Sequence, residues 1–323
     1  MARRPAPNVV DSRNASHRGA TRRLAVSLLV SLRPHQWTKN LIIFAALIFG
    51  RRLDEPAVVV RTVEAFCVFC VLSGVVYLIN DVVDREADRL HPLKARRPIA
   101  AGEVAPGLAL GVAAILAAAG MAASFGLSRS FGLVSAGYLA LLGLYSGPLK
   151  RLVIVDVLTI AMGFVLRAVA GAVVAEVEIG HWLLVLTVML ALFVGFSKRR
   201  HELVSLAGDA AGHRENLGRY SAPLLDQLIG ITAAGTLIVY AISTLSPETI
   251  EKFGSGQLGL TLPFPVYGIF RYLYLVYGKD GGGSPAEALL TDWPLLLCVG
   301  LWGVAVIAII YAGPLPIWGA ARD

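Results

Sequence analysis

The fold of this chain is decided by an apolar run, residues 58–79, that ends in the polar sequence Asn80-Asp81-Val82-Val83-Asp84-Arg85-Glu86-Ala87-Asp88. Residues four apart lie about one turn apart in an α-helix, so Asn80, Asp84 and Asp88 are predicted to share one helix face, with Asp81 beside them. Carboxylates crowded on one face repel each other unless a cation lies among them. Because amide and carboxylate oxygens suit a hard cation, we predict a catalytic Mg²⁺ site here, with Asn80, Asp84 and Asp88 as ligands and Asp81 as a further catalytic acid.

Basic residues follow this acidic motif closely. They are Arg85, Arg89, Lys94, Arg96 and Arg97. A solvated acidic helix end is the alternative interpretation, but ionisable residues at membrane depth are usually functional. Acids that hold a metal beside bases that hold phosphate together predict a diphosphate site, with Lys94, Arg96 and Arg97 among its substrate-binding residues.

The composition predicts an all-α, polytopic membrane protein. Of the 323 residues, 56% are hydrophobic and 16% are charged, and the mean hydropathy of +0.67 is too high for a soluble protein of this length. Repeated apolar runs near 20 residues indicate membrane-spanning helices. We expect about nine, around a polar cavity that faces the cytoplasm: residues 24–49, 58–82, 104–124, 130–146, 154–174, 181–197, 222–245, 261–277 and 293–312.

The distribution of basic residues predicts the orientation and the domain limits. The tail before the first span and the loops after spans 2, 4, 6 and 8 carry 20 of the 29 Lys and Arg residues, which places them in the cytoplasm. We therefore expect a multi-pass protein of the inner (plasma) membrane with its active site on the cytoplasmic side. Residues 1–22 are expected to form a disordered basic tail, 23–315 a single transmembrane catalytic domain and 316–323 a short tail.

The net charge of +7 also limits the partners. Because the bases lie beside membrane spans, we expect membrane lipids and phosphorylated substrates as partners and no nucleic acid. For the oligomeric state our hypothesis is a homo-oligomer, with a trimer as the guess.

Two further clusters carry candidate substrate-binding residues. The first follows the fourth span: Tyr145 and Lys150 can contact a phosphate, and Asp156 and Arg167 are charged residues inside the next apolar run that need partners. The second is Lys198-Arg199-Arg200-His201-Glu202 at the end of the sixth span. It is either a topological anchor or a phosphate clamp in which Glu202 holds one base in place.

These motifs resemble the UbiA superfamily of intramembrane prenyltransferases. The resemblance rests on Asn80-Asp81-x-x-Asp84-x-x-x-Asp88 at a span end, on the stretch from Tyr145 to Lys150, and on the number of spans. It implies a helical membrane fold in which Mg²⁺ binds the diphosphate of a donor through two acidic motifs. The second acidic motif of that superfamily lies in the loop after the sixth span.

The chain departs from the superfamily pattern in that loop. It contains the basic cluster and a single Asp, Asp209, in place of a second acidic motif. With the segment from Arg33 to Asn40, this pattern is similar to a branch that transfers 5-phosphoribose from phosphoribosyl pyrophosphate to a polyprenyl phosphate such as decaprenyl phosphate, for cell-wall arabinan synthesis.

The resemblance also implies roles for individual residues. Mg²⁺ on the acidic motif would neutralise the pyrophosphate, helped by Lys150 and the bases after the motif. Lys198 and Arg199 would grip the ribose 5-phosphate, and Lys39 or Arg167 would position the lipid phosphate. Two alternatives stay open: an aromatic, quinone-type prenyltransferase of the same fold, and a cation-coupled transporter.

Overall fold

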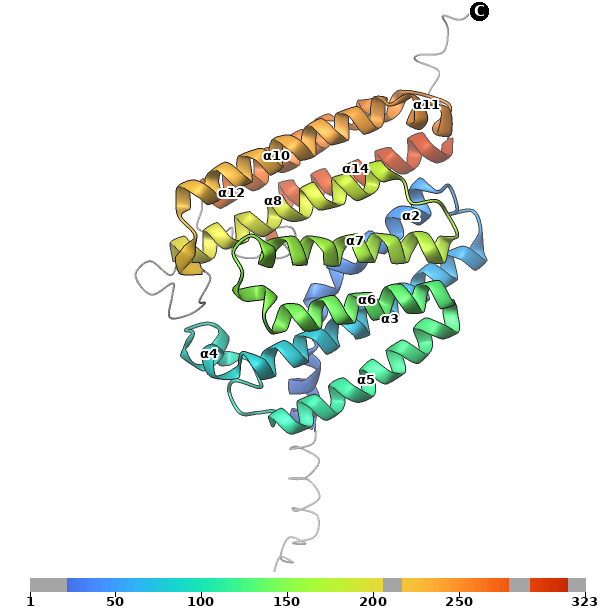
Figure 1. The fold of residues 1–323 in the computed structure, drawn as a ribbon. Coiled ribbons are helices and arrows are strands. Elements are labelled where there is room, and N and C mark those ends of the chain that lie inside the picture. The colour runs from blue at the N-terminus through green and yellow to red at the C-terminus, as the bar shows by residue number, and fades with distance from the viewer. Residues whose placement is uncertain (1–21, 206–216, 279–290, 313–323) are drawn as a thin grey trace, which may run out of the picture.

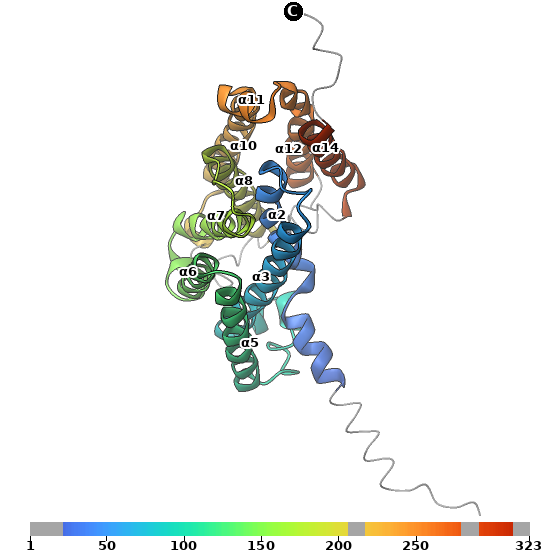
Figure 2. The same cartoon turned by 90° about the vertical axis from the view of Figure 1, so that its right-hand side faces the viewer.

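A computed structural model describes residues 22–205, 217–278 and 291–312, and every regular element in these ranges is a helix. The long helices run side by side in a stack (Figure 1). Turned by 90°, the stack shows α3, α5 and α6 in one half and α8, α10, α12 and α14 in the other, with α2 and α7 between them (Figure 2). The predicted all-α fold class is therefore confirmed.

The α-helices have the following bounds: α2 (Ile43–Phe49), α3 (Pro56–Val83), α4 (Arg85–Leu90), α5 (Pro106–Leu127), α6 (Arg129–Ser146), α7 (Val155–Ala175), α8 (His181–Ser205), α10 (Ala222–Leu245), α11 (Pro247–Phe253), α12 (Pro263–Gly278) and α14 (Trp293–Ala312). Five short 3-10 helices connect them: η1 (Pro34–Ile42), η2 (Lys94–Arg96), η3 (Leu149–Arg151), η4 (Leu217–Arg219) and η5 (Gln257–Thr261). Residues 22–31 are also helical.

Proline and serine mark the starts of the helices. Pro56 and Pro106 open α3 and α5, where a missing N–H costs no helical hydrogen bond. Ser128 caps α6 by accepting a hydrogen bond from the N–H of Phe131 at 3.1 Å, and Ser221 caps α10 in the same way. Each cap pairs an N–H group that the helix itself leaves unpaired.

Six of the described helices are long and apolar enough to cross a membrane: α3, α5, α7, α8, α10 and α14. The expected spans at 130–146 and 261–277 correspond to α6 and α12, of 18 and 16 residues. The expected first span, 24–49, is not one helix. It breaks at Arg33, which has a φ of 54°, and continues from Pro34 as η1 and α2. The chain is thus an integral, multi-pass helical membrane protein.

One close contact sets the position of this first segment. A Cβ atom on Gly171 of α7 would lie 2.1 Å from the carbonyl oxygen of Ile43, so only glycine lets α2 lie this close to α7. The contact places the residues just before Ile43 against the middle of α7. These residues include Lys39 and Asn40.

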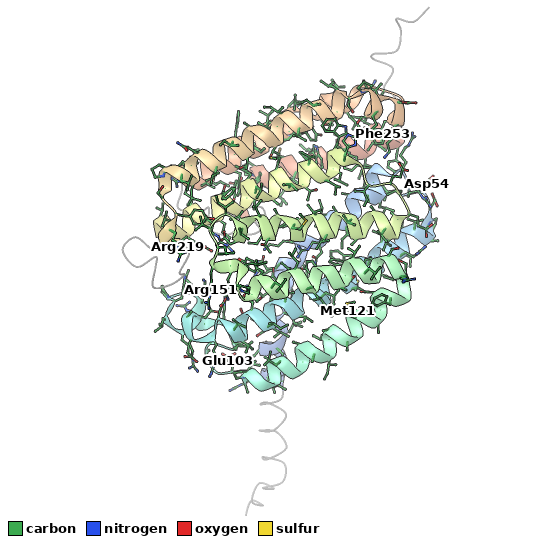
Figure 3. The ribbon with its side chains drawn as sticks, in the orientation of Figure 1. Asp54, Glu103, Met121, Arg151, Arg219 and Phe253 are labelled. Atoms are coloured by element: carbon green, nitrogen blue, oxygen red, sulfur yellow. The ribbon has the colours of Figure 1, made fainter. Side chains whose placement is uncertain are left out.

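The stack places several loops at the same end. Figure 3 shows Glu103, Arg151 and Arg219 at one end of the bundle and Asp54 and Phe253 at the other. The end of α3, the end of α6 and the end of α8 therefore lie together, as the predicted topology requires. The predicted tails, most of the loop with Asp209, and the Gly-rich segment after α12 lie outside the described residues.

Candidate active site

The acidic motif spans the junction between α3 and α4. The N–H of Asp84 donates to the carbonyl of Asn80 and the N–H of Asp88 donates to the carbonyl of Asp84, each at 2.8 Å. These hydrogen bonds keep the one-turn spacing of the three residues, although α3 ends at Val83 and Asp84, with a ψ of 4°, separates it from α4. Asp81 and Asp88 are buried, whereas Asn80 and Asp84 are half-buried.

Basic residues separate the side chains of the motif into two pairs. Asp81 and Asp88 form the first pair, and Asn80 and Asp84 form the second. Arg97 donates to Asp81 at 3.2 Å and to Asp88 at 2.6 Å. Arg33 also donates to Asp81, at 2.5 Å. On the other side, the Lys150 ammonium pairs with Asp84.

The second pair is completed by Asn80, whose amide donates to Asp84 at 3.0 Å. In the part of the chain that the structure describes, no three His, Cys, Asp or Glu side chains gather into one metal-binding group. Asp81 and Asp88 share Arg97, whereas Asp84 pairs with Lys150. The donor chemistry of Asn80 and Asp84 nevertheless fits a hard divalent cation, which usually takes only one or two carboxylates and completes its shell with water and substrate phosphate.

The other predicted bases of this region differ in position. Lys94 and Arg96 lie on η2, where Lys94 is half-buried and Arg96 is exposed. Arg97 follows η2 directly and is the base that reaches the acidic motif. Arg33, which no pattern in the sequence singled out as a site residue, is the second. Its position directly before Pro34 was the available signal, because helices usually end at or before the residue that precedes a proline.

A second cluster of charges is completely buried between α7 and α8. Asp156, in the first turn of α7, accepts from Arg199 Nε at 2.9 Å and from the Tyr220 hydroxyl at 2.9 Å. Asp156 is 0% exposed and the Arg199 side chain 2%. Burial raises the pKa of Tyr220 to about 12, so its phenol keeps the proton that it donates. Tyr220 was not predicted, because the network joins residues 64 positions apart.

Arg199 is therefore committed to carboxylates rather than presented to a ligand. It also pairs with Glu202 on the next turn of α8. Lys198 lies closer to the surface: its side chain is 44% exposed and its ammonium lies 3.9 Å from Glu202. Tyr145, in the last turn of α6, lies within electrostatic range of Arg199. Lys198 and Arg199 were both expected to bind one phosphate. Because Arg199 is held by carboxylates, Lys198 is the candidate that remains.

Arg167 is also held by neighbouring residues. It donates to Asn40 at 2.7 Å, to the Tyr138 hydroxyl at 2.6 Å and to the Gly163 carbonyl at 3.0 Å. Lys39, beside Asn40, forms no hydrogen bond or ion pair with any described residue, yet lies close enough to Arg33 and Arg167 for their charges to interact.

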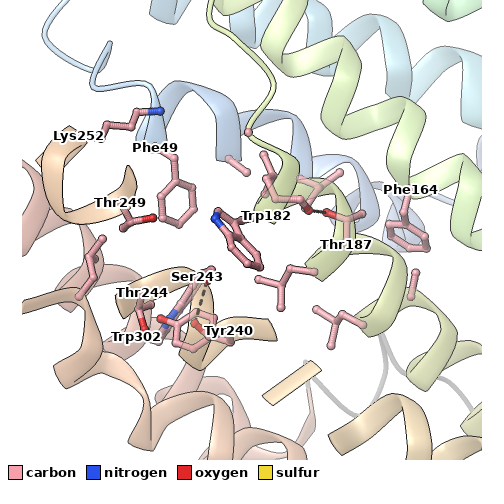
Figure 4. Close-up of a pocket in the computed structure, with 18 of the residues that line it drawn as sticks. Phe49, Phe164, Trp182, Thr187, Tyr240, Ser243, Thr244, Thr249, Lys252 and Trp302 are labelled. Atoms are coloured by element: carbon pink, nitrogen blue, oxygen red, sulfur yellow. Dashed lines mark hydrogen bonds between the residues drawn. The ribbon is translucent and has the colours of Figure 1, made fainter. Parts of the chain in front are cut away.

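Lys39 also lines a mostly apolar pocket of about 420 Å³. Segments from η1, α2, α7, α8, α10, α11 and α14 form its wall. Figure 4 shows Phe49, Trp182 and Tyr240 entering it from three different helical segments. The size is that of a pocket for a small organic ligand or part of a larger one, and the lining suits a hydrocarbon chain.

Comparison with known proteins matches the model of the UbiA prenyltransferase family to residues 40–288. The chain therefore belongs to the UbiA prenyltransferase family, as its motifs predicted. Among solved structures, a UbiA homologue from Archaeoglobus fulgidus bound to GPP and Mg²⁺ aligns with a TM-score of 0.69 over 88% of this chain and 99% of that one, at 21% identity. At that identity the likeness establishes the fold.

The curated relatives are more specific. The decaprenyl-phosphate phosphoribosyltransferase of Mycolicibacterium smegmatis is 32% identical over 306 residues, which cover 91% of this chain and 95% of the relative. The enzyme of the same name from Corynebacterium glutamicum is 31% identical over 320 residues, 96% of this chain and 94% of the relative. The Mycobacterium tuberculosis H37Rv enzyme is 32% identical over 296 residues, 90% of this chain and 96% of the relative.

Proposed function

We propose that this protein transfers 5-phosphoribose from phosphoribosyl pyrophosphate to a polyprenyl phosphate, such as decaprenyl phosphate, and releases pyrophosphate, in the supply of cell-wall arabinan precursors. The observation that carries the proposal is that α8 brings a basic segment, and no second acidic one, to the end of the bundle that holds the acidic motif. A donor with both a diphosphate and a separate phosphate matches one acidic and one basic site. The names of the curated relatives support the same reaction.

The acidic motif is the proposed diphosphate site. Asn80, Asp84 and Asp88 were the predicted Mg²⁺ ligands. Because Asp88 pairs with Arg97 at 2.6 Å, we now propose that Asn80 and Asp84 would hold Mg²⁺, which when bound neutralises the charge of the leaving pyrophosphate. Lys150, Arg97 and Arg33 lie against the carboxylates and would supply positive charge beside the phosphate oxygens. Asp81 and Asp88 keep these two arginines in place.

The basic segment of α8 is the proposed site for the ribose 5-phosphate. Lys198 supplies the contact, because it is the more exposed of the two bases. Arg199 and Glu202 position it, and Asp156 and Tyr145 support Arg199. Lys94 and Arg96 add positive charge at the same end of the bundle.

The pocket beside Lys39 is the proposed site of the acceptor lipid. Its ammonium would bind the lipid phosphate, and the first isoprene units would lie against the apolar wall. Arg167 keeps Asn40, and with it Lys39, in place. In the reaction a phosphate oxygen forms a bond to the anomeric carbon as the bond from that carbon to pyrophosphate breaks. This oxygen is already anionic near neutral pH, so no strong general base is needed.

The membrane arrangement completes the proposal. We propose nine spans, formed by the six long apolar helices together with α6, α12 and the segment of η1 and α2. The site then opens to the cytoplasm from the inner membrane, by the excess of basic residues at that end. A homotrimer stays our hypothesis for the assembly, and residues 23–315 our prediction for the catalytic domain.

The test uses the purified full chain in detergent with Mg²⁺ and a radiolabelled polyprenyl phosphate. One sample receives phosphoribosyl pyrophosphate, and another receives a polyprenyl diphosphate with 4-hydroxybenzoate. We expect a new phosphorylated glycolipid in the first sample and its loss with a chelator. A prenylated aromatic product in the second sample and none in the first would overturn the proposal in favour of ordinary prenyl transfer.

A further inference from the structure

The residue that precedes α7 has a strained backbone. Ile154 has a φ of 69° and a ψ of −46°, and the N–H of Val155 donates to the carbonyl of Val153 at 2.8 Å. This is a γ-turn of the rare positive-φ form. Of the four non-glycine residues with positive φ in the described ranges, Ile154 is the one with a β-branched side chain. Such a conformation persists only where its surroundings hold it.

One side-chain hydroxyl group bonds to this turn, in addition to the backbone hydrogen bonds of the turn and of α7. The N–H of Ile154 donates to the Tyr220 oxygen at 2.6 Å, and the same hydroxyl donates to Asp156 Oδ1 at 2.9 Å. Tyr220 is 5% exposed, so water does not compete for these bonds. The first N–H groups of a helix have no partner within it, and here the phenol supplies one for the residue at the start of α7.

The turn lies between two residues of the proposed site. Before it, η3 carries Lys150, which pairs with Asp84. After it, Asp156 binds Arg199, which adjoins Lys198 on α8. The hydroxyl of Tyr220 therefore bonds the chain at the point where the diphosphate side of the site connects to the 5-phosphate side.

We propose that Tyr220 is a positioning residue that sets the separation between Lys150 and the basic segment of α8 by holding the Ile154 turn and Asp156 together. This inference rests on the proposed function. The hydroxyl touches neither substrate; it acts through the turn and through the buried carboxylate. A donor with phosphates at both ends must contact Lys150 and the basic segment together, so its affinity depends on their separation. The acceptor lipid is bound beside Lys39, so its affinity does not.

The test is Tyr220→Phe in the purified full chain, assayed with phosphoribosyl pyrophosphate and a polyprenyl phosphate. We expect the KM for the donor to rise about tenfold, as for a lost hydrogen bond to a charged group, with the KM for the lipid unchanged. A residue with a merely structural role would lower the amount of active protein and leave both KM values unchanged. Equal KM values in the variant and the parent would therefore overturn the proposal.

Two further variants sharpen the assay. Tyr272→Phe is the matched control, because that buried hydroxyl has no hydrogen-bond partner among the described residues; it should leave both KM values unchanged. Ile154→Gly added to Tyr220→Phe should lower the donor KM again, since glycine adopts positive φ without strain. A donor KM that stays high in the double variant would overturn the role given to the turn.

A measurement without substrates separates this inference from the proposed function. Hydrogen exchange of the amides at residues 150–156 should become about tenfold faster in Tyr220→Phe and not in Tyr272→Phe. Unchanged exchange would overturn the inference even if the transfer reaction is correct. Exchange could also become faster in Tyr220→Phe although the parent protein does not use phosphoribosyl pyrophosphate. That result would support the role of Tyr220 at the Ile154 turn and overturn only the proposed reaction.

Discussion

The acidic motif and the Asp156 cluster contain the same kinds of group in different surroundings. In the acidic motif, the Asp84 and Lys150 side chains are 29% and 16% exposed. In the Asp156 cluster, Asp156 and Arg199 are 0% and 2% exposed. A pair that can reach solvent can exchange its partner for a ligand's charge, whereas a fully buried pair cannot be broken without leaving a charge unpaired. The first region is thus suited to binding and the second to holding the bundle together.

The largest expected effect tests the buried side of this comparison. Asp156→Asn should lower the free energy of unfolding by about 3–5 kcal/mol, because it leaves buried Arg199 and Tyr220 with a weaker partner. The measurement is reversible unfolding of the purified protein in mixed detergent. Asp84→Asn is the matched variant and should change the stability by less than about 1 kcal/mol. Equal losses in the two variants would remove the distinction between the regions.

The next effect tests the exposed side. Asp84→Asn should lower kcat/KM roughly a hundredfold, because the variant loses a ligand of the Mg²⁺ that would neutralise the leaving pyrophosphate. The folded protein should remain, as measured by its elution and its circular dichroism. Titration with Mg²⁺ in the presence of the donor should also show that the variant binds Mg²⁺ more weakly than the parent. Near-normal turnover would contradict the assignment of the acidic motif as the diphosphate site.

A smaller effect is expected on α8. Lys198→Ala should raise the KM for phosphoribosyl pyrophosphate about tenfold, since a charged hydrogen bond to the 5-phosphate is lost. A donor analogue without that phosphate should show no such change. Arg200→Ala is the control, because Arg200 instead binds Asp226 at 2.5 Å and lies over the ring of Tyr277. If Lys198→Ala and Arg200→Ala change the KM equally, and do so for both donors, the basic segment is only a topological anchor.

The smallest effect concerns a carboxylate in the same sequence motif. Glu86 is 75% exposed and pairs with Arg89 at 3.1 Å on the outer side of α4. Glu86→Gln should change stability by less than about 1 kcal/mol, as for other surface ion pairs, and leave kcat and both KM values unchanged. Steady-state kinetics beside the Asp84 variant provide the check. A large loss would show that charge density, rather than position on the helix face, governs the site.

Local periodicity predicted much of this architecture, and long-range contacts explain what it missed. The one-turn spacing of Asn80, Asp84 and Asp88 followed from their positions in the sequence, although the break in the helix at Asp84 did not. The division of its carboxylates did not, because Arg33 and Lys150 come from 48 and 66 positions away.

The basic segment of α8 shows the same limit. Neighbouring residues point about 100° apart around a helix, so Lys198 faces outward and Arg199 inward, although the sequence alone treats them alike. Which face is buried depends on α7, and no pattern within α8 contains that information. The roles of both regions stay predictions until the variants above are measured.

The winding of η1 has a consequence for how membrane segments are counted. A 3-10 helix rises about 2.0 Å per residue and an α-helix about 1.5 Å, so η1 and α2 together reach about 28 Å, whereas the same residues wound as one α-helix would reach about 24 Å. The hydrocarbon core of a bilayer is about 30 Å thick. A segment stretched in this way is nearly as long as that core is thick, with fewer residues than hydropathy windows require.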